Sequence, residues 1–315
     1  MEHPSSTPQA SPIGLFDSGV GGLSVAREIV RQLPAHPLVY LADQAHAPYG
    51  QRSLAQIQGF AEGITRFLLA EGARVIVIAC NTASAAALHG LRREFPAVLF
   101  VGMEPAIKPA AERTRSGHVG VIATAATFQG ELFSSLLDRF ANGVSIHTQV
   151  CPELVPLVEA GELDSPATTA ALDSYLSPLL AAGIDQLVLG CTHYPFLRPL
   201  IAQIAGPGVE IIDPAAAVAR QTGRVLAQHG WMIAPGGRTA DAAAEDAGPM
   251  SHEQAASQWD DVARLPSLDD RSRFFTTGDP VRFRAMLLNL LGLDAPVAAA
   301  RWRETCHPVL CAKSG

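Results

Sequence analysis

Two short stretches of this sequence repeat one pattern, and no other feature constrains the fold as strongly. They span residues 75–82 (VIVIACNT) and 186–193 (QLVLGCTH), and each is an apolar run followed by a small residue, a cysteine and a nearby threonine. Short apolar runs rich in β-branched residues are typical of buried parallel strands. Open α/β sheets bind ligands at the carboxyl ends of such strands. The pattern therefore predicts one thiol at each of two such strand ends, and we ask whether both thiols face one substrate.

Strand-like and helix-like segments alternate on both sides of this repeat. Strands are predicted at 13–17, 38–42, 75–79 and 98–101, and a second series at 119–123, 144–149, 186–190 and 209–212. Strict alternation of strand and helix predicts a parallel, doubly wound sheet. Because the two series correspond strand for strand, we expect an α/β fold of two similar doubly wound parallel-sheet units. A pseudo-two-fold axis would relate them and place the active site in the cleft between them.

The length of 315 residues also favours two units. We assign residues 13–106 with 217–293 to the first unit and residues 107–216 to the second. Residues 234–270 are rich in Ala, Gly, Asp, Glu and Ser without periodicity, so we expect a mobile insertion there. Residues 1–12 and 294–315 are expected to be flexible termini.

Composition excludes several classes of function. A net charge of −7 without any basic run argues against nucleic-acid binding, and the apolar stretches are too short to cross a membrane. The first twelve residues lack the pattern of a signal peptide, and five cysteines without scaffold spacing are typical of free thiols in a reducing cytoplasm. Only Lys108 and Lys313 could form the Schiff base that pyridoxal phosphate requires, and neither lies in a suitable context.

Two further motifs suggest ligands only weakly. The glycine-rich turn of Gly19, Gly21 and Gly22 precedes a predicted helix and could present N–H groups to an anion, or it could simply be a tight turn. Its spacing is not that of a dinucleotide fingerprint, although Asp43 could mimic the acidic residue of that motif. Cys306 with its neighbours does not supply the ligand number that zinc requires. We therefore expect neither a metal nor a cofactor.

Cys80 and Cys191 are stronger candidates for chemistry. Both precede predicted helix N-termini, a position that lowers a thiol pKa from about 8.5. His193 can point the same way as Cys191, and Asp17 at the end of a neighbouring strand could serve Cys80. With a thiol on each face of a Cα–H, one removes the proton while the other delivers a proton to the opposite face. A cysteine amidohydrolase using Cys191 and His193 is an alternative that leaves Cys80 unexplained. A non-catalytic small-molecule binding protein is another.

Several motifs together resemble glutamate racemase, of the cofactor-independent aspartate/glutamate racemase superfamily. The resemblance spans about residues 13–293, and its segments are 14–22 (GLFDSGVGG), 42–43 (AD), 48–50 (PYG), 79–84 (ACNTAS), 190–195 (GCTHYP), 212–214 (IDP) and 276–280 (TTGDP). It implies that glutamate is the substrate, that the D-enantiomer supplies peptidoglycan synthesis, that no cofactor is needed and that the chain forms a homodimer. An aspartate racemase or a one-thiol member of the superfamily is the nearest alternative.

The same resemblance assigns roles to individual residues. It implies that Cys80 deprotonates D-glutamate with help from Asp17, and that Cys191 deprotonates L-glutamate with help from His193, which Glu159 supports. The residues expected to contact the substrate, besides Asp17 and His193, are Ser18, Tyr49, Gly50, Asn81, Thr82, Thr124, Thr127 and Thr192. Asp17 could instead cap the turn, His193 could be structural, and Glu159 could lie on a solvated helix face. The threonines after the cysteines could cap helices as well as bind ligand.

Overall fold

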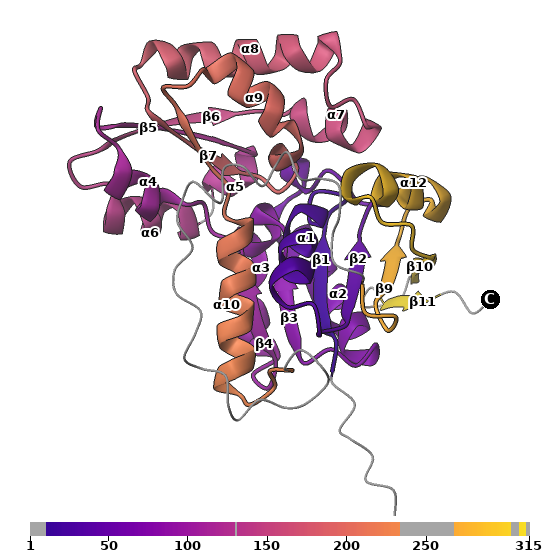
Figure 1. The fold of residues 1–315 in the computed structure, drawn as a ribbon. Helices are drawn as coiled ribbons and strands as arrows, with labels where there is room; N and C mark the ends of the chain where they lie inside the picture. Colours follow the sequence, from indigo (N-terminus) through magenta and orange to yellow (C-terminus); the bar gives the residue numbers. More distant parts are fainter. Residues whose placement is uncertain (1–10, 130, 234–267, 304–308, 313–315) are drawn as a thin grey trace, which may run out of the picture.

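The computed structural model describes residues 11–129, 131–233, 268–303 and 309–312, which form two α/β units (Figure 1). The expectations for residues 1–10, the insertion over 234–267, Cys306 and Lys313 fall outside the described residues, as does the side chain of Cys311. Within the described part, no helix combines the length and the apolarity that a membrane span requires.

The first unit is built on a seven-stranded sheet in the order β11-β10-β9-β2-β1-β3-β4. Its strands are β1 (Ile13–Asp17), β2 (Leu38–Ala42), β3 (Val75–Ile78), β4 (Leu99–Gly102), β9 (Arg273–Thr276), β10 (Val297–Arg303) and β11 (Val309–Ala312). All neighbours pair in parallel except β10 and β11. The helices of this unit are α1 (Leu23–Gln32), α2 (Leu54–Ala70), α3 (Asn81–Glu94), α10 (Ala215–Gln228) and α12 (Pro280–Leu291).

Helices cover both faces of this sheet, which explains why its central strands are apolar throughout. Leu15 and Val77 belong to the core that includes α1, α10 and α12, whereas Phe16 and Ile78 belong to the core under α2 and α3. Successive residues of one strand therefore enter different cores, as the two-residue period of a strand requires. The central strands are therefore held by packing on both of their faces.

The second unit repeats this arrangement on a four-stranded parallel sheet in the order β6-β5-β7-β8. Its strands are β5 (His118–Ala123), β6 (Ser145–Val150), β7 (Gln186–Gly190) and β8 (Glu210–Ile212). Its helices are α4 (Ile107–Arg113), α5 (Ala125–Gln129), α6 (Glu131–Phe140), α7 (Leu154–Ala160), α8 (Pro166–Ala181) and α9 (Arg198–Ala205). The first four strands of each unit share one spatial order (second, first, third, fourth), so the predicted α/β fold of two similar units is confirmed.

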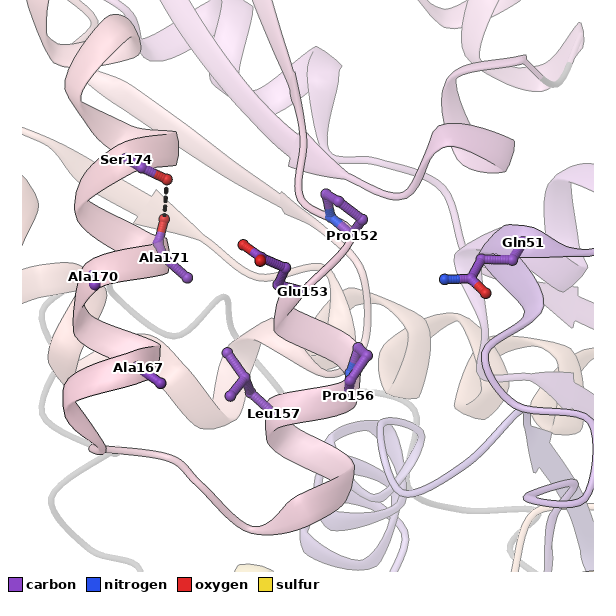
Figure 2. A pocket seen from close by; sticks show the side chains of 9 residues that line it. All are labelled: Gln51, Pro152, Glu153, Pro156, Leu157, Ala167, Ala170, Ala171 and Ser174. Carbon is purple, nitrogen blue, oxygen red and sulfur yellow. Dashed lines mark hydrogen bonds between the residues drawn. The ribbon is translucent and has the colours of Figure 1, made fainter.

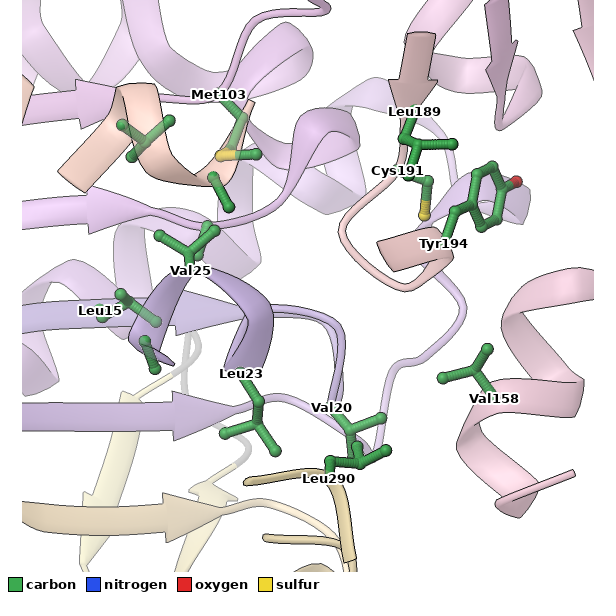
Figure 3. Close-up of a cluster of buried hydrophobic side chains, with 14 of the residues drawn as sticks. Leu15, Val20, Leu23, Val25, Met103, Val158, Leu189, Cys191, Tyr194 and Leu290 are labelled. Carbon is green, nitrogen blue, oxygen red and sulfur yellow. The ribbon is translucent and has the colours of Figure 1, made fainter. Parts of the chain in front are cut away.

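One hydrophobic core runs continuously from the first unit into the second. It contains Leu23 of α1 and Leu290 of α12 together with Val158 of α7 and Leu189 of β7 (Figure 3). Cys191 belongs to the same cluster and lies beside Leu189 and Tyr194 of the second unit (Figure 3). Burial of this shared apolar surface favours the closed arrangement of the two units.

The C-terminal segment differs from the sequence prediction. A flexible terminus was expected over 294–315, but residues 297–303 and 309–312 form β10 and β11 at the edge of the first sheet. The run Val297-Ala298-Ala299-Ala300 has little β-branched or aromatic character, so it carries a weak strand signal. The segment pairs with β9, and its Trp302 packs against the core under α2. These partners are distant in the chain, so the local sequence does not reveal the strand.

Candidate active site

Cys80 lies two residues after the third strand of the first unit and caps the helix that follows. Its sulfur accepts a hydrogen bond from the Ala83 N–H at 3.4 Å, in the place where a serine side chain would cap α3. The expected lowering of its pKa is wrong. Burial raises the pKa of Cys80 well above its ordinary value, and the nearby Asp17 carboxylate raises it further, while the Ala83 N–H opposes this only in part. Cys80 is therefore a protonated thiol at neutral pH.

Asp17 is fully buried at the carboxyl end of β1 and interacts with the Cys80 thiol. Its Oδ2 accepts hydrogen bonds from the Gly22 N–H at 2.6 Å and from the Thr192 hydroxyl of the second unit at 3.4 Å. The Ser18 hydroxyl reaches Oδ1 at 3.4 Å. Burial raises the pKa of Asp17 in spite of His193 and these donors. Asp17 caps the turn and also lies beside a thiol, and its expected role of assisting Cys80 stays a prediction.

Cys191, His193 and Glu159 form a second acid–base group, in the second unit. The sulfur of Cys191 lies 3.7 Å from His193 Nδ1, and His193 Nε2 lies 2.7 Å from Glu159 Oε1. Burial lowers the pKa of His193, but its hydrogen bonds with Cys191 and Glu159 outweigh this, and the pKa is raised well above its usual value. An imidazolium between a thiol and a carboxylate can stabilise a thiolate. A 3₁₀ turn, η2 (Tyr194–Leu197), begins three residues after Cys191 and continues into α9, so the predicted helix begins with a 3₁₀ turn.

Glu159 lies on α7 and is not on a solvated face. Its Oε1 also accepts a hydrogen bond from the Val20 N–H at 2.7 Å, and its Oε2 accepts one from the Gln44 side chain at 2.9 Å. Burial raises the pKa of Glu159, but these donors and His193 outweigh burial and the pKa is lowered. Val20 and Gln44 belong to the first unit, so the carboxylate joins both units. The sequence contains no local signal for the role of Gln44.

The glycine-rich turn packs against Glu159, His193 and Asp17. A Cβ on Gly19 would lie 1.8 Å from Glu159 Oε1, and a Cβ on Gly21 would lie 2.3 Å from His193 Nδ1. A Cβ on Gly22 would lie 2.7 Å from the Cβ of Asp17. The turn lacks side chains because Glu159, His193 and Asp17 occupy that space. No nucleotide is needed to explain its composition.

Hydroxyl and amide groups complete the interface between the units. Thr82 at the start of α3 and Thr124 after β5 approach to 2.9 Å between their hydroxyl oxygens, and Thr124 and Thr127 approach equally closely. Asn81 is 3% exposed, and neither polar atom of its side chain has a partner. Buried polar atoms without partners are costly, and a bound ligand can satisfy them. The donors expected to hold carboxylates are thus brought together.

Tyr49 and Gly50 lie in the short helix η1 (Tyr49–Gln51), whose Gly50 packs beside Thr124 of the second unit. The hydroxyl of the Tyr49 side chain donates a hydrogen bond to Asp43 Oδ2 at 2.7 Å. Asp43, at 0% exposure, also accepts hydrogen bonds from His46, Thr277 and Trp302. It is a structural anchor for this loop and not a ribose-binding residue.

Two cavities border the site without reaching the thiols. The larger, of about 630 Å³, lies between α7 and α8, with Gln51 projecting toward it from the first unit (Figure 2). The smaller, of about 330 Å³, is lined by residues including Gln44, Pro48, Glu159 and Arg282. Cys80 and Cys191 are 5% and 7% exposed, so both thiols are closed off from solvent in this arrangement of the units. Among the described residues, no group of three or more His, Cys, Asp or Glu side chains could hold a metal ion.

Comparison with known proteins agrees with this geometry. A family model described as Asp/Glu/Hydantoin racemase matches residues 13–222. A glutamate racemase of Ectopseudomonas mendocina (strain ymp) is 55% identical over 287 residues, which cover 91% of this chain and 97% of that protein. The structure of glutamate racemase isoform RacE1 from Bacillus anthracis has a TM-score of 0.72 at 32% identity, covering 91% of this chain and 96% of that one. That of glutamate racemase from Francisella tularensis in complex with D-glutamate has a TM-score of 0.71 at 26% identity, with the same coverages.

Proposed function

This chain belongs to the Asp/Glu/hydantoin racemase family, and from that premise and the site geometry we propose that it interconverts L-glutamate and D-glutamate. Its relatives over most of the chain are glutamate racemases. The product D-glutamate supplies peptidoglycan synthesis, as the family's role implies. The reaction is an isomerisation at Cα that requires no cofactor.

One observation carries the proposal: two buried thiols, one from each unit, each beside its own acid–base partner. Cys80 lies with Asp17 and Cys191 lies with His193, and the two pairs are close enough that Cys191 and Cys80 interact electrostatically. A hydrolase that uses one cysteine and one histidine has no use for the second pair. A racemase needs both, because a proton must leave one face of Cα and arrive at the other.

Proton transfer then balances in both directions. For L-glutamate, the Cys191 thiolate takes the α-proton while the Cys80 thiol donates its proton to the opposite face, so one Cα–H bond breaks and another forms. The high pKa of Cys80 suits it to the donor role at that stage. The cycle leaves a thiolate at Cys80 and a thiol at Cys191, and proton exchange through Asp17 and His193 restores the starting state. D-glutamate follows the reverse path.

The substrate carboxylates are held by hydroxyls, an amide and backbone N–H groups. We assign the α-substituents to Ser18, Asn81, Thr82 and Thr192, and the side-chain carboxylate to Thr124 and Thr127, with backbone contacts from Tyr49 and Gly50. The unpartnered amide of Asn81 and the contact between Thr82 and Thr124 support this assignment. These donors would also stabilise the carbanion-like transition state in a dry site.

A direct assay tests the reaction. Purified protein with EDTA and without pyridoxal phosphate is given L-glutamate or D-glutamate, and the optical rotation is followed to equilibrium. We expect both enantiomers to reach the same racemic end point, with aspartate turned over far more slowly. Faster turnover of aspartate than of glutamate would refute the substrate assignment. No change for either amino acid would refute the proposed activity.

We also propose a cytoplasmic location and a homodimeric assembly. A cytoplasmic location fits the free, buried thiols Cys80, Cys151 and Cys191, because such thiols persist in reducing compartments. The homodimer follows from the family resemblance, and light scattering should give twice the chain mass of 33.2 kDa. A monomer mass at micromolar concentration would refute the dimer.

A further inference from the structure

We infer that Gln44 is a positioning residue for Cys191: it orients Glu159 behind His193, and it does so only when the two units are closed on each other. This inference rests on the proposed function, because it assigns His193 and Glu159 to the activation of Cys191. Gln44 does not contact either thiol. Its role would be exerted entirely through the carboxylate.

Two hydrogen bonds fix the orientation of the Gln44 side-chain amide. Its Nε2 lies 2.9 Å from Glu159 Oε2, and its Oε1 lies 2.8 Å from the Thr276 hydroxyl. An ionised carboxylate only accepts hydrogen bonds, so the amide nitrogen must face Glu159. The Thr276 oxygen already accepts from the Gly278 N–H at 3.0 Å, which directs its own proton to Gln44.

The backbone beneath Gln44 is equally constrained. The preceding residue, Asp43, is fully buried and receives four hydrogen-bond donors, from Tyr49, His46, Thr277 and Trp302. On the other side, a Cβ on Gly278 would lie 2.9 Å from the Cβ of Gln44, so Gly278 leaves space for this side chain. Gln44 therefore extends from a rigid support toward the second unit.

The donors to Glu159 come from both units. His193 lies on the same unit as Glu159, whereas Val20 and Gln44 lie on the first unit, more than one hundred residues away in sequence. Separation of the units would remove both distant donors and leave the carboxylate free to rotate. The imidazolium would then lose the partner that stabilises it. Asp17, in contrast, receives its shortest hydrogen bond from Gly22 of its own loop.

This arrangement couples closure to the chemistry at Cys191. In the open state, in which substrate enters, Glu159 is not held and the Cys191 thiolate is disfavoured. Closure brings Gln44 and Val20 against Glu159 and completes the chain of hydrogen bonds from Thr276 to Cys191. The reactive thiolate thus forms when the site is shielded from water.

Two variants perturb Gln44 in different ways. Gln44→Leu removes the donor and retains similar bulk, and Gly278→Ala displaces the side chain without removing any hydrogen-bonding group. Gln58→Leu is the matched control, because the exposed Gln58 also donates from its side chain in the first unit but to the Ala86 carbonyl, away from Glu159. Circular dichroism melting curves establish that each variant is folded.

The primary readout is the ultraviolet absorbance of the Cys191 thiolate as a function of pH. It is measured in a Cys80→Ala background and corrected with the Cys80→Ala/Cys191→Ala double variant. Gln44→Leu and Gly278→Ala should each raise the midpoint by about one pH unit, the effect of one hydrogen bond to a charged group. In the otherwise unsubstituted enzyme, each should lower kcat/KM about tenfold. Gln58→Leu should change neither quantity.

The thiolate titration separates this inference from the proposed activity. A shifted midpoint in a protein without racemase activity would support the positioning role and refute the activity. Racemase activity with unshifted midpoints in both variants would overturn the positioning role alone. An equal shift in Gln58→Leu would also overturn it, because the effect would then not depend on Glu159.

Discussion

At the scale of single residues, the site consists of two thiols in different electrostatic surroundings. Cys80 lies beside a carboxyl group, and burial raises the pKa of both partners. Cys191 lies beside an imidazolium that a carboxylate supports. For the proposed turnover of L-glutamate, these surroundings suit Cys80 to act as the acid and Cys191 to act as the base.

His193 should be essential for efficient turnover. His193→Asn removes the imidazolium that stabilises the Cys191 thiolate, so kcat/KM should fall by about 100-fold, at the lower end of what general acid–base groups contribute. Because the equilibrium constant between enantiomers is unity, the loss should be equal in both directions. Steady-state assays by circular dichroism measure it, with substitution of the exposed His229 at the C-cap of α10, His229→Asn, as control. Retention of more than half of the activity would contradict this role.

Sequence could predict those residues that lie within local motifs. Cys80, Cys191 and His193 follow recognisable apolar strands, and Asp17 ends another. The hydrogen bonds of Gln44 and of the Val20 N–H could not be predicted, because their partner Glu159 is distant in the chain. The pKa of Cys80 is raised where the sequence predicts that it is lowered. The sequence indicates the helix N-terminus after this cysteine but not the burial that raises the pKa.

At the scale of elements, turns and strand ends determine the geometry of the site. Each cysteine follows the third strand of its unit, and the glycine-rich turn after β1 packs against Glu159, His193 and Asp17. Each of the eight strands predicted from hydrophobic periodicity corresponds to an observed strand. The strands β10 and β11 were not predicted, and they form by pairing at a sheet edge.

The glycine-rich turn should not tolerate even one methyl group at position 21. In Gly21→Ala the new Cβ would lie 2.3 Å from His193 Nδ1, so the imidazole must move away from Cys191. We expect kcat/KM to fall by about 100-fold, because displacements of about 1 Å have that effect on positioned groups. Gly59→Ala in α2, where nothing lies within 4 Å of the new methyl group, should retain activity. Equal activity of the two variants would contradict the packing described here.

The connection from β8 to α10 should make stability depend on pH. The Asp213 carboxyl accepts a hydrogen bond from the Ala215 N–H, and burial raises its pKa to about 6. A carboxyl whose native pKa is raised stabilises the fold below its unfolded pKa near 3.8, and this is lost as pH rises through about 6. Part of the side chain reaches solvent, so we expect a loss of about 1–2 kcal/mol.

Asp213→Asn tests this directly, since the amide oxygen can still accept from Ala215 but carries no titrating proton. Urea unfolding at pH 4, 5, 6 and 7 gives the unfolding free energy of both proteins. The stability of the unsubstituted protein relative to Asp213→Asn should decrease as pH rises over this range. Parallel curves would show that the carboxyl keeps an ordinary pKa.

At the scale of the whole molecule, two similar units share one hydrophobic core and one site. Neither unit holds the complete set of proposed catalytic groups, because Asp17 and Cys80 come from one and Cys191, His193 and Glu159 from the other. The two corresponding series of strands along the sequence predict that two similar units share one site. The division at 13–106 with 217–293 and 107–216 stays a prediction, and limited proteolysis can examine it.

The most direct measurement of the central claim follows Cα deuteration and optical rotation together in D₂O, without cofactor. L-glutamate is incubated with the unsubstituted protein, with Cys80→Ala and with Cys191→Ala. The account predicts that rotation is lost and that every D-glutamate molecule formed carries deuterium at Cα. Each single variant should lose racemisation, since a thiol is then missing from one face. Racemisation without deuterium, or full activity in either variant, would contradict a two-thiol reaction across the two units.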